Sequence, residues 1–166
     1  SKGVMLTHLN IRSAAASILA YLEYGQDDVI LNVLPLSFDY GLYQVLMGVK
    51  VGARIVLEPS FAYPHAVFQR IEQERVTVLP LVPTLIAAVL ETKPDRYDLT
   101  SVRCMTTTGA ALPTDHIRRL RERLPKVKLF SMYGLTECKR VSYLPPEELD
   151  QRPMSVGKGM PNQELY

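Results

Sequence analysis

The segment with the clearest chemical signal is residues 131–137, in which an aromatic residue and a glycine precede a hydroxyl and a carboxylate. Tyr133 offers a flat ring for a purine, and Gly134 lets the backbone approach a ligand without an intervening side chain. Thr136 can donate a hydrogen bond to a phosphate, and Glu137 carries the carboxylate oxygens that Mg²⁺ prefers. On these residues alone, a nucleotide site and an ordinary surface turn both remain open.

Three other segments hold residue types that suit the same ligand. Lys2 stands beside a glycine ahead of a helical pattern and can meet a phosphate, with a solvated terminal lysine as the alternative. Residues 106–111 are small enough for a planar ring to lie against the backbone, or for a helix to pack closely on a sheet. Phe38 and Tyr40 can line an apolar pocket, or belong to the core with Asp39 as the cap of the next helix.

Composition and charge narrow the classes of protein. The chain has 166 residues, 47% of them hydrophobic, which suits one domain or part of a larger one. The net charge is +2, and the basic cluster at 118–123 fits a solvated helix face, so we expect no nucleic-acid partner. No histidine forms a nucleophile arrangement with serine or cysteine, and the two cysteines lack metal-ligand spacing. Without an apolar run long enough for a membrane span, we expect a cytoplasmic protein with no transmembrane segment.

Short apolar runs alternate with longer amphipathic runs along the chain. Strands of about five residues separated by helices of about ten are typical of βαβ units, and they predict an α/β fold with a mostly parallel sheet flanked by helices. We expect helices at roughly 11–24, with Thr7 or Asn10 as its cap, and at 40–49, 64–74, 83–91 and 114–123. Strands are expected at 29–34, 53–57, 77–81, 102–107 and 128–132. The stretch 145–161 is predicted to be a loop.

The candidate ligand residues follow the ends of predicted strands. Residues 35–40, 108–111 and 133–137 come after three different strands. Because ligands of parallel α/β sheets gather at the carboxyl ends of the strands, we expect these three segments to form one site.

Taken together and in this order, the segments resemble the adenylate-forming superfamily of acyl-CoA synthetases, peptide-synthetase adenylation domains and luciferases. Residues 2–8 are similar to the end of that family's phosphate loop, residues 35–39 to the segment beside its acyl pocket, and residues 108–113 to its adenine segment. Residues 133–137 match the motif Tyr-Gly-x-Thr-Glu, and residues 155–161 resemble its Val-Gly-x-x-x-Pro run. The five motifs span nearly the whole chain.

The resemblance implies a two-step reaction that uses ATP, Mg²⁺ and coenzyme A. A carboxylic acid attacks the α-phosphate of ATP, and a thiol of coenzyme A or of a carrier's phosphopantetheine then takes the acyl group. By analogy, Thr136 and Glu137 are catalytic candidates: Thr136 bonds the α-phosphate and Glu137 holds Mg²⁺. Tyr133 stacks on adenine with Gly134 beside it.

The resemblance assigns two further groups of residues. Lys2 completes the nucleotide site near the β- and γ-phosphates, and three small residues face Tyr133, namely Gly109, Ala110 and Ala111. The acyl pocket is assigned to Phe38, Tyr40 and Thr108.

The resemblance covers only part of the family's length. We expect residues 1–166 to be a partial AMP-binding N-terminal domain without the C-terminal lid domain. The parent would be an acyl-CoA ligase, and the isolated fragment would be inactive and open to self-association. Cys138-Lys139-Arg140 departs from the apolar residues that usually follow this motif.

Two other functions stay open at this stage. One is a non-catalytic α/β module that binds a nucleotide or a partner. The other is an amino-acid adenylation domain, in which an aspartate often follows the aromatic residue as Asp39 follows Phe38 here. Against it, the sequence indicates no carboxylate placed for a substrate ammonium.

Overall fold

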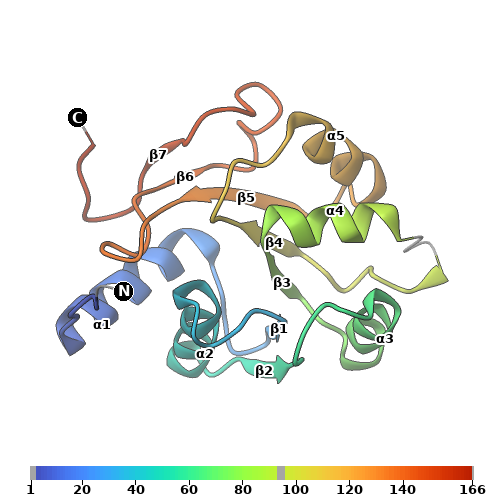
Figure 1. Ribbon diagram of the computed structural model, residues 1–166, viewed down its shortest axis with the longest axis horizontal. Coiled ribbons are helices and arrows are strands. Elements are labelled where there is room, and N and C mark those ends of the chain that lie inside the picture. Colours follow the sequence, from blue (N-terminus) through green and yellow to red (C-terminus); the bar gives the residue numbers. More distant parts are fainter. Residues whose placement is uncertain (1–2, 93–95, 166) are drawn as a thin grey trace.

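The computed structural model describes residues 3–92 and 96–165 (Figure 1). Lys2 therefore lies outside the described residues. A seven-stranded sheet has the order β2-β1-β3-β4-β5-β6-β7. The five strands from β1 to β5 run parallel, and β6 and β7 join antiparallel at one edge. The strands are β1 Val29–Asn32, β2 Arg54–Leu57, β3 Val78–Leu81, β4 Cys104–Thr107, β5 Lys128–Tyr133, β6 Ser142–Leu144 and β7 Lys158–Gly159.

Among the described residues, five helices cover the two faces of this sheet. They are α1 His8–Leu22, α2 Asp39–Val51, α3 Pro64–Glu74, α4 Pro83–Glu91 and α5 Thr114–Arg123. Helices α1 and α2 lie on one face, and α3, α4 and α5 lie on the other (Figure 1). The predicted α/β fold with alternating βαβ units and a mostly parallel sheet is confirmed.

Successive strand residues fill two separate cores, one on each face. Ile30, Val78 and Cys104 pack with α1 and α2, whereas Leu31 and Leu79 pack with the three other helices. Because both faces are covered, β3 is apolar throughout and β1 is apolar up to Asn32, without the hydrophobic–polar alternation of a half-exposed strand, as is usual for parallel sheets.

The predicted cap Thr7 is confirmed although the ends of its helix differ, and the prediction of a loop over 145–161 was wrong. The first helix begins at His8 because Thr7 and Asn10 form a reciprocal capping box, and it ends at Leu22 because Glu23 takes a left-handed conformation (φ 54°). The stretch 145–161 is not all loop, since it contains β7, which pairs with the unpredicted strand β6. Strands of two and three residues are too short for a hydrophobic period to mark them.

The loop after β1 is fixed by a buried asparagine at the end of that strand. The Asn32 side-chain amide donates to the Gly41 carbonyl at 3.2 Å, and its oxygen accepts from the Leu34 amide at 3.2 Å. The Tyr40 hydroxyl lies 2.6 Å from Thr106 Oγ1 on β4. These contacts set where the loop carries Phe38.

A polar cluster ties three strands together at their amino ends. The Asp28 carboxylate accepts from Arg103 Nε at 2.8 Å, from Thr77 Oγ1 at 2.6 Å and from the Gly25 amide at 2.9 Å. Burial opposes the charge, but hydrogen bonds led by Arg103 and Thr77 hold the pKa of Asp28 below its ordinary value of 3.8. The charged carboxylate therefore stabilises the folded chain.

We expect Asp28→Asn to lower the free energy of unfolding by about 2–3 kcal/mol, because charge-assisted hydrogen bonds are lost. Since the folded-state pKa is depressed, this stabilisation is complete above the ordinary value and is lost as pH falls through the folded-state pKa. Chemical denaturation at neutral pH and near pH 3 measures both effects. The matched control is Asp27→Asn at the exposed neighbour. An equal loss in the two variants would contradict the prediction.

Candidate functional site

A cavity of about 400 Å³ opens at the carboxyl ends of β4 and β5. Its lining comes from residues 108–112, 131–135 and 153–156, three segments that are far apart in the sequence. Five of the nucleotide-binding candidates that the structure describes line this cavity: Gly109, Ala110, Ala111, Tyr133 and Gly134. The sixth, Thr136, does not line it. Thr108, assigned to the acyl pocket, also borders this cavity.

The walls of this cavity combine an exposed ring with a flat backbone surface. Tyr133 is 45% exposed, and Gly109 and its two alanine neighbours are exposed. Gly109 has φ +93°, and a Cβ added there would stand 3.9 Å from the Phe38 ring. Phe38, from the loop after β1, therefore reaches the same place, so the strand-end segments do converge.

The turn that joins β5 to β6 is closed tightly. The Val141 amide donates to the Tyr133 carbonyl at 2.9 Å. A Cβ on Gly134 would lie 2.1 Å from the Lys139 carbonyl oxygen, closer than any side chain can come. A glycine is thus required at position 134 because the Lys139 backbone packs against it. The same lack of a side chain also suits a nearby ligand.

Thr136 and Glu137 lie exposed near the tip of this turn. Glu137 borders a second cavity, of about 390 Å³, together with Lys139 and Tyr43. Within residues 3–92 and 96–165, no three His, Cys, Asp or Glu side chains gather as metal ligands. A single carboxylate still fits Mg²⁺ that is held mainly by substrate phosphates and water.

Tyr40 differs from its assignment to the acyl pocket. Its side chain is fully buried between α2 and the sheet, and burial raises the pKa of its hydroxyl. As the second residue of α2 it points toward Thr106 in the core, whereas Phe38, just before the helix, stays 36% exposed. Phe38 is therefore partly exposed and packs edge-on against the Tyr40 ring, whereas Thr108 is only 3% exposed at the border of the cavity.

Asp39 does not cap α2, and that interpretation was wrong. The cap position belongs to Phe38 and carries no side-chain hydrogen bond, while Asp39 is the first helical residue. Its carboxylate faces Lys139, with Oδ2 3.8 Å from Nζ. The expectation that no carboxylate is placed for a substrate ammonium stays a prediction, since Asp39 meets a cation of the protein itself.

Lys139, which borders the second cavity, and its neighbour Arg140 were not among the candidates from the sequence. Both are buried, which long cationic side chains rarely are without a partner. The available signal was their place after the Thr-Glu pair, where the family usually has apolar residues.

Other reactive groups lie away from this site. Burial raises the pKa of the Cys104 thiol to about 12, so it is not a nucleophile near neutral pH. His65 Nδ1 is 2.9 Å from the Tyr97 hydroxyl, a surface contact on the other face. In the part of the chain that the structure describes, no helix has the length and apolar character needed to cross a membrane.

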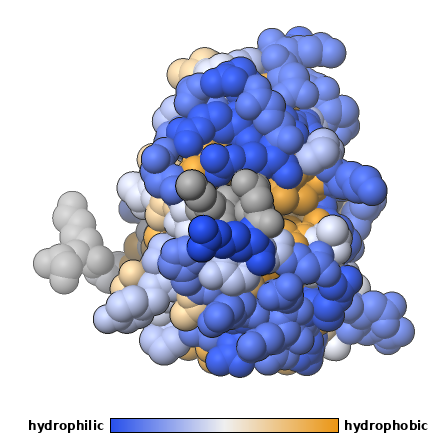
Figure 2. All heavy atoms as spheres, turned by 90° about the vertical axis from the view of Figure 1, so that its right-hand side faces the viewer, coloured by the Kyte–Doolittle hydropathy of each residue, from blue (hydrophilic) through white to orange (hydrophobic). Residues whose placement is uncertain are grey.

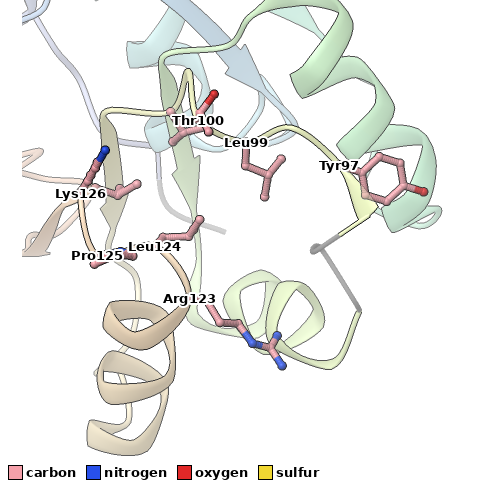
Figure 3. A pocket seen from close by; sticks show the side chains of 9 residues that line it. Tyr97, Leu99, Thr100, Arg123, Leu124, Pro125 and Lys126 are labelled. Carbon is pink, nitrogen blue, oxygen red and sulfur yellow. The ribbon is translucent and has the colours of Figure 1, made fainter.

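A third cavity, of about 360 Å³, lies beyond the amino ends of β4 and β5. Figure 2 shows hydrophobic surface in a hollow on a mostly hydrophilic side, and Figure 3 shows the cavity, lined by Leu99, Thr100 and Leu124 among others. None of the candidate residues borders it, so the site stays at the carboxyl ends.

The comparisons with known proteins agree with this geometry. A family model described as "AMP-binding enzyme" matches residues 1–166. The chain belongs to the AMP-binding enzyme family. The resemblance seen in the motifs of the sequence is thereby confirmed.

Three relatives show how much of the family's length is present. 4-Coumarate-CoA ligase 1 of Narcissus pseudonarcissus is 38% identical over 143 residues, covering 82% of this chain and 26% of that ligase. VinN in complex with L-aspartate is 34% identical with a TM-score of 0.83, covering 95% of this chain and 40% of VinN. O-succinylbenzoate coenzyme A synthetase (MenE) from Bacillus subtilis, with ATP and magnesium ion, is 30% identical with a TM-score of 0.85, covering 96% and 33%. The chain thus spans well under half of each.

We expect Gly134→Ala to lower the free energy of unfolding by about 3 kcal/mol or more, because the turn would have to open. Gly109→Ala should cost about 1–2 kcal/mol, since its positive φ is strained but its surroundings are open. Gly25→Ala is the control, because nothing lies within 4 Å of the added Cβ. Urea denaturation ranks the three variants, and equal losses at Gly134 and Gly25 would refute the close return of the turn.

Proposed function

We propose that this chain is the nucleotide-binding part of an ATP-dependent ligase that activates a carboxylic acid as an acyl-adenylate and transfers it to a thiol. The observation that carries the proposal is the cavity that brings Tyr133 together with Gly109, Ala110 and Ala111. An exposed ring and a backbone surface without large side chains suit a purine. MenE, solved with ATP and magnesium ion, shares this fold.

The proposed chemistry needs positioning and charge neutralisation more than a protein nucleophile. A carboxylate oxygen of the acid attacks the α-phosphorus of ATP, and the bond to the pyrophosphate oxygen breaks. Tyr133 holds the adenine, and the exposed Thr136 hydroxyl donates to the α-phosphate. Mg²⁺ would neutralise phosphate charge when bound, and Glu137 is the carboxylate that would hold it.

Coenzyme A is the proposed thiol, because the relatives that match by sequence are named as CoA ligases. A carrier's phosphopantetheine is the alternative acceptor. We further propose that the chain is part of the large N-terminal domain and that a C-terminal lid lies elsewhere in the whole protein. In the nucleotide site, Lys2 would approach the β- and γ-phosphates. The proposed compartment is the cytoplasm.

Amino-acid adenylation is a second candidate function, and the position of Asp39 favours it. This carboxylate has only 13% of its side chain exposed and lies beside Phe38, where a substrate ammonium could be held. VinN, which is similar over 95% of this chain, was solved with L-aspartate. A screen that contains amino acids as well as simple acids separates the two functions.

In the whole protein that contains this chain, we expect Glu137→Gln to lower acid-dependent ATP–pyrophosphate exchange roughly 100-fold, because charge on the phosphates is no longer neutralised. The control is Glu122→Gln, an exposed carboxylate on α5. The 166-residue chain alone should give no exchange. Exchange by this chain above its own Glu137→Ala variant would show that it is catalytically sufficient, and full activity of Glu137→Gln would remove Glu137 from the mechanism.

We also propose that the isolated chain self-associates through the outer side of α2 and β2. Val49 and Leu57 are exposed there, and β2 is an edge strand with unpaired backbone groups. Light scattering after size exclusion should show mass rising with concentration, and Val49→Lys should reduce it, whereas a monomer at high concentration would contradict the proposal.

A further inference from the structure

Two neighbouring cations are buried directly behind the Thr136-Glu137 pair. Lys139 is 7% exposed and Arg140 is 5% exposed. Removing such charges from water is costly unless each meets an opposite charge or a full set of acceptors. The partners of Lys139 and Arg140 therefore show whether the protein alone balances the two charges and uses all of their hydrogen-bond donors.

Lys139 has one protein carboxylate within reach. Its Nζ lies 3.8 Å from Asp39 Oδ2, a distance too long for a hydrogen bond, and 4.9 Å from the centre of the Tyr43 ring. The two charges attract each other without a hydrogen bond, so the Nζ donors stay available to a further acceptor.

Arg140 has no carboxylate partner among the residues that the structure describes. Its Nη1 donates to the Lys139 carbonyl at 2.9 Å, and its guanidinium lies 4.7 Å from the centre of the Tyr40 ring. Its buried Nε has no hydrogen-bond partner. The cluster thus contains two cations against one carboxylate, with a donor left over.

The surrounding tyrosines do not supply the missing negative charge. Burial raises the pKa of the Tyr40 and Tyr43 hydroxyls, which keeps both neutral near neutral pH. Tyr43 Oη is itself buried without a partner. A bound anion would satisfy both the charge and the unused donors.

The cluster lies next to the groups that border the proposed acid site. Asp39 directly follows Phe38, whose ring reaches the Gly109 backbone. Lys139 and Glu137 border the same cavity of about 390 Å³. An acid whose reacting carboxylate is held near the Thr136-Glu137 turn would therefore extend its far end toward Lys139, with the neighbouring Arg140 buried beside it.

We propose that Lys139 and Arg140 form an anion-binding end of the acid pocket, and that the substrate is a short carboxylic acid with a second carboxylate. The guanidinium matches a carboxylate with two parallel hydrogen bonds, and the lysine adds a point charge. Asp39 attracts Lys139 by charge, and an amino group on the same acid would be a second cationic partner for its carboxylate. This inference rests on the proposed function and adds the substrate class.

The test is ATP–pyrophosphate exchange by the whole protein with matched pairs of acids: succinate against butyrate, and aspartate against 2-aminobutyrate. We expect kcat/KM to be roughly 100-fold higher for at least one diacid than for its partner, because an unpaired buried cation rejects the apolar end. Exchange confined to the monoacids would overturn the inference and keep the proposed function. Exchange with no acid in a broad screen would overturn both.

Variants assign the effect to the two cations. Arg140→Gln and Lys139→Gln should each raise the KM for the diacid at least roughly tenfold and narrow the kcat/KM ratio between diacid and monoacid, because the cation that rejects the apolar end is removed. Arg118→Gln, at an exposed arginine on α5, is the control. Circular dichroism confirms folding, and Arg140→Lys replaces Arg140→Gln if the latter does not fold. An equal loss of exchange with the diacid and with its matched monoacid would show that the cations have only a structural role.

Discussion

The close approach of the Lys139 backbone to Gly134, within the turn that joins β5 to β6, is the constraint on which the candidate site depends. The Lys139 carbonyl lies where the Cβ of any other residue at position 134 would have to be. This contact lets β5 and β6 leave the turn as neighbours, which turns Tyr133 toward one cavity and Glu137 toward another. It also brings Lys139 and Arg140 under the start of α2.

The doubly covered sheet supplies the platform for this turn. Because each strand sends alternate residues into two cores, its position is fixed from both sides. Tyr21 on α1 stacks on Tyr143 of β6 with ring centres 3.9 Å apart, and its hydroxyl donates to Met132 Sδ on β5. The loops at the carboxyl ends are thus mounted on rigid strands, as a binding site requires.

Buried charged side chains have different hydrogen-bond partners at the two ends of the sheet. At the amino ends, Asp28 is met by Arg103, Thr77 and a backbone amide, so the cluster is complete within the protein. At the carboxyl ends, Arg140 keeps an unused donor and Lys139 meets its carboxylate only at 3.8 Å. Hydrogen bonding that is complete within the protein fits a structural cluster, whereas the donors left unused beside a cavity are the basis of the proposed anion site.

The sequence by itself determined the alternation of strands and helices, the parallel sheet and the convergence of three strand-end segments, because these follow from local hydrophobic patterns and from the geometry of parallel strands. It also determined the family, through short motifs in a fixed order. Only the tertiary structure decided that Tyr40 turns into the core, that Asp39 faces Lys139 and does not cap a helix, and that β6 and β7 extend the sheet. Each of these depends on which residues meet across long distances along the chain, and no local pattern encodes that pairing.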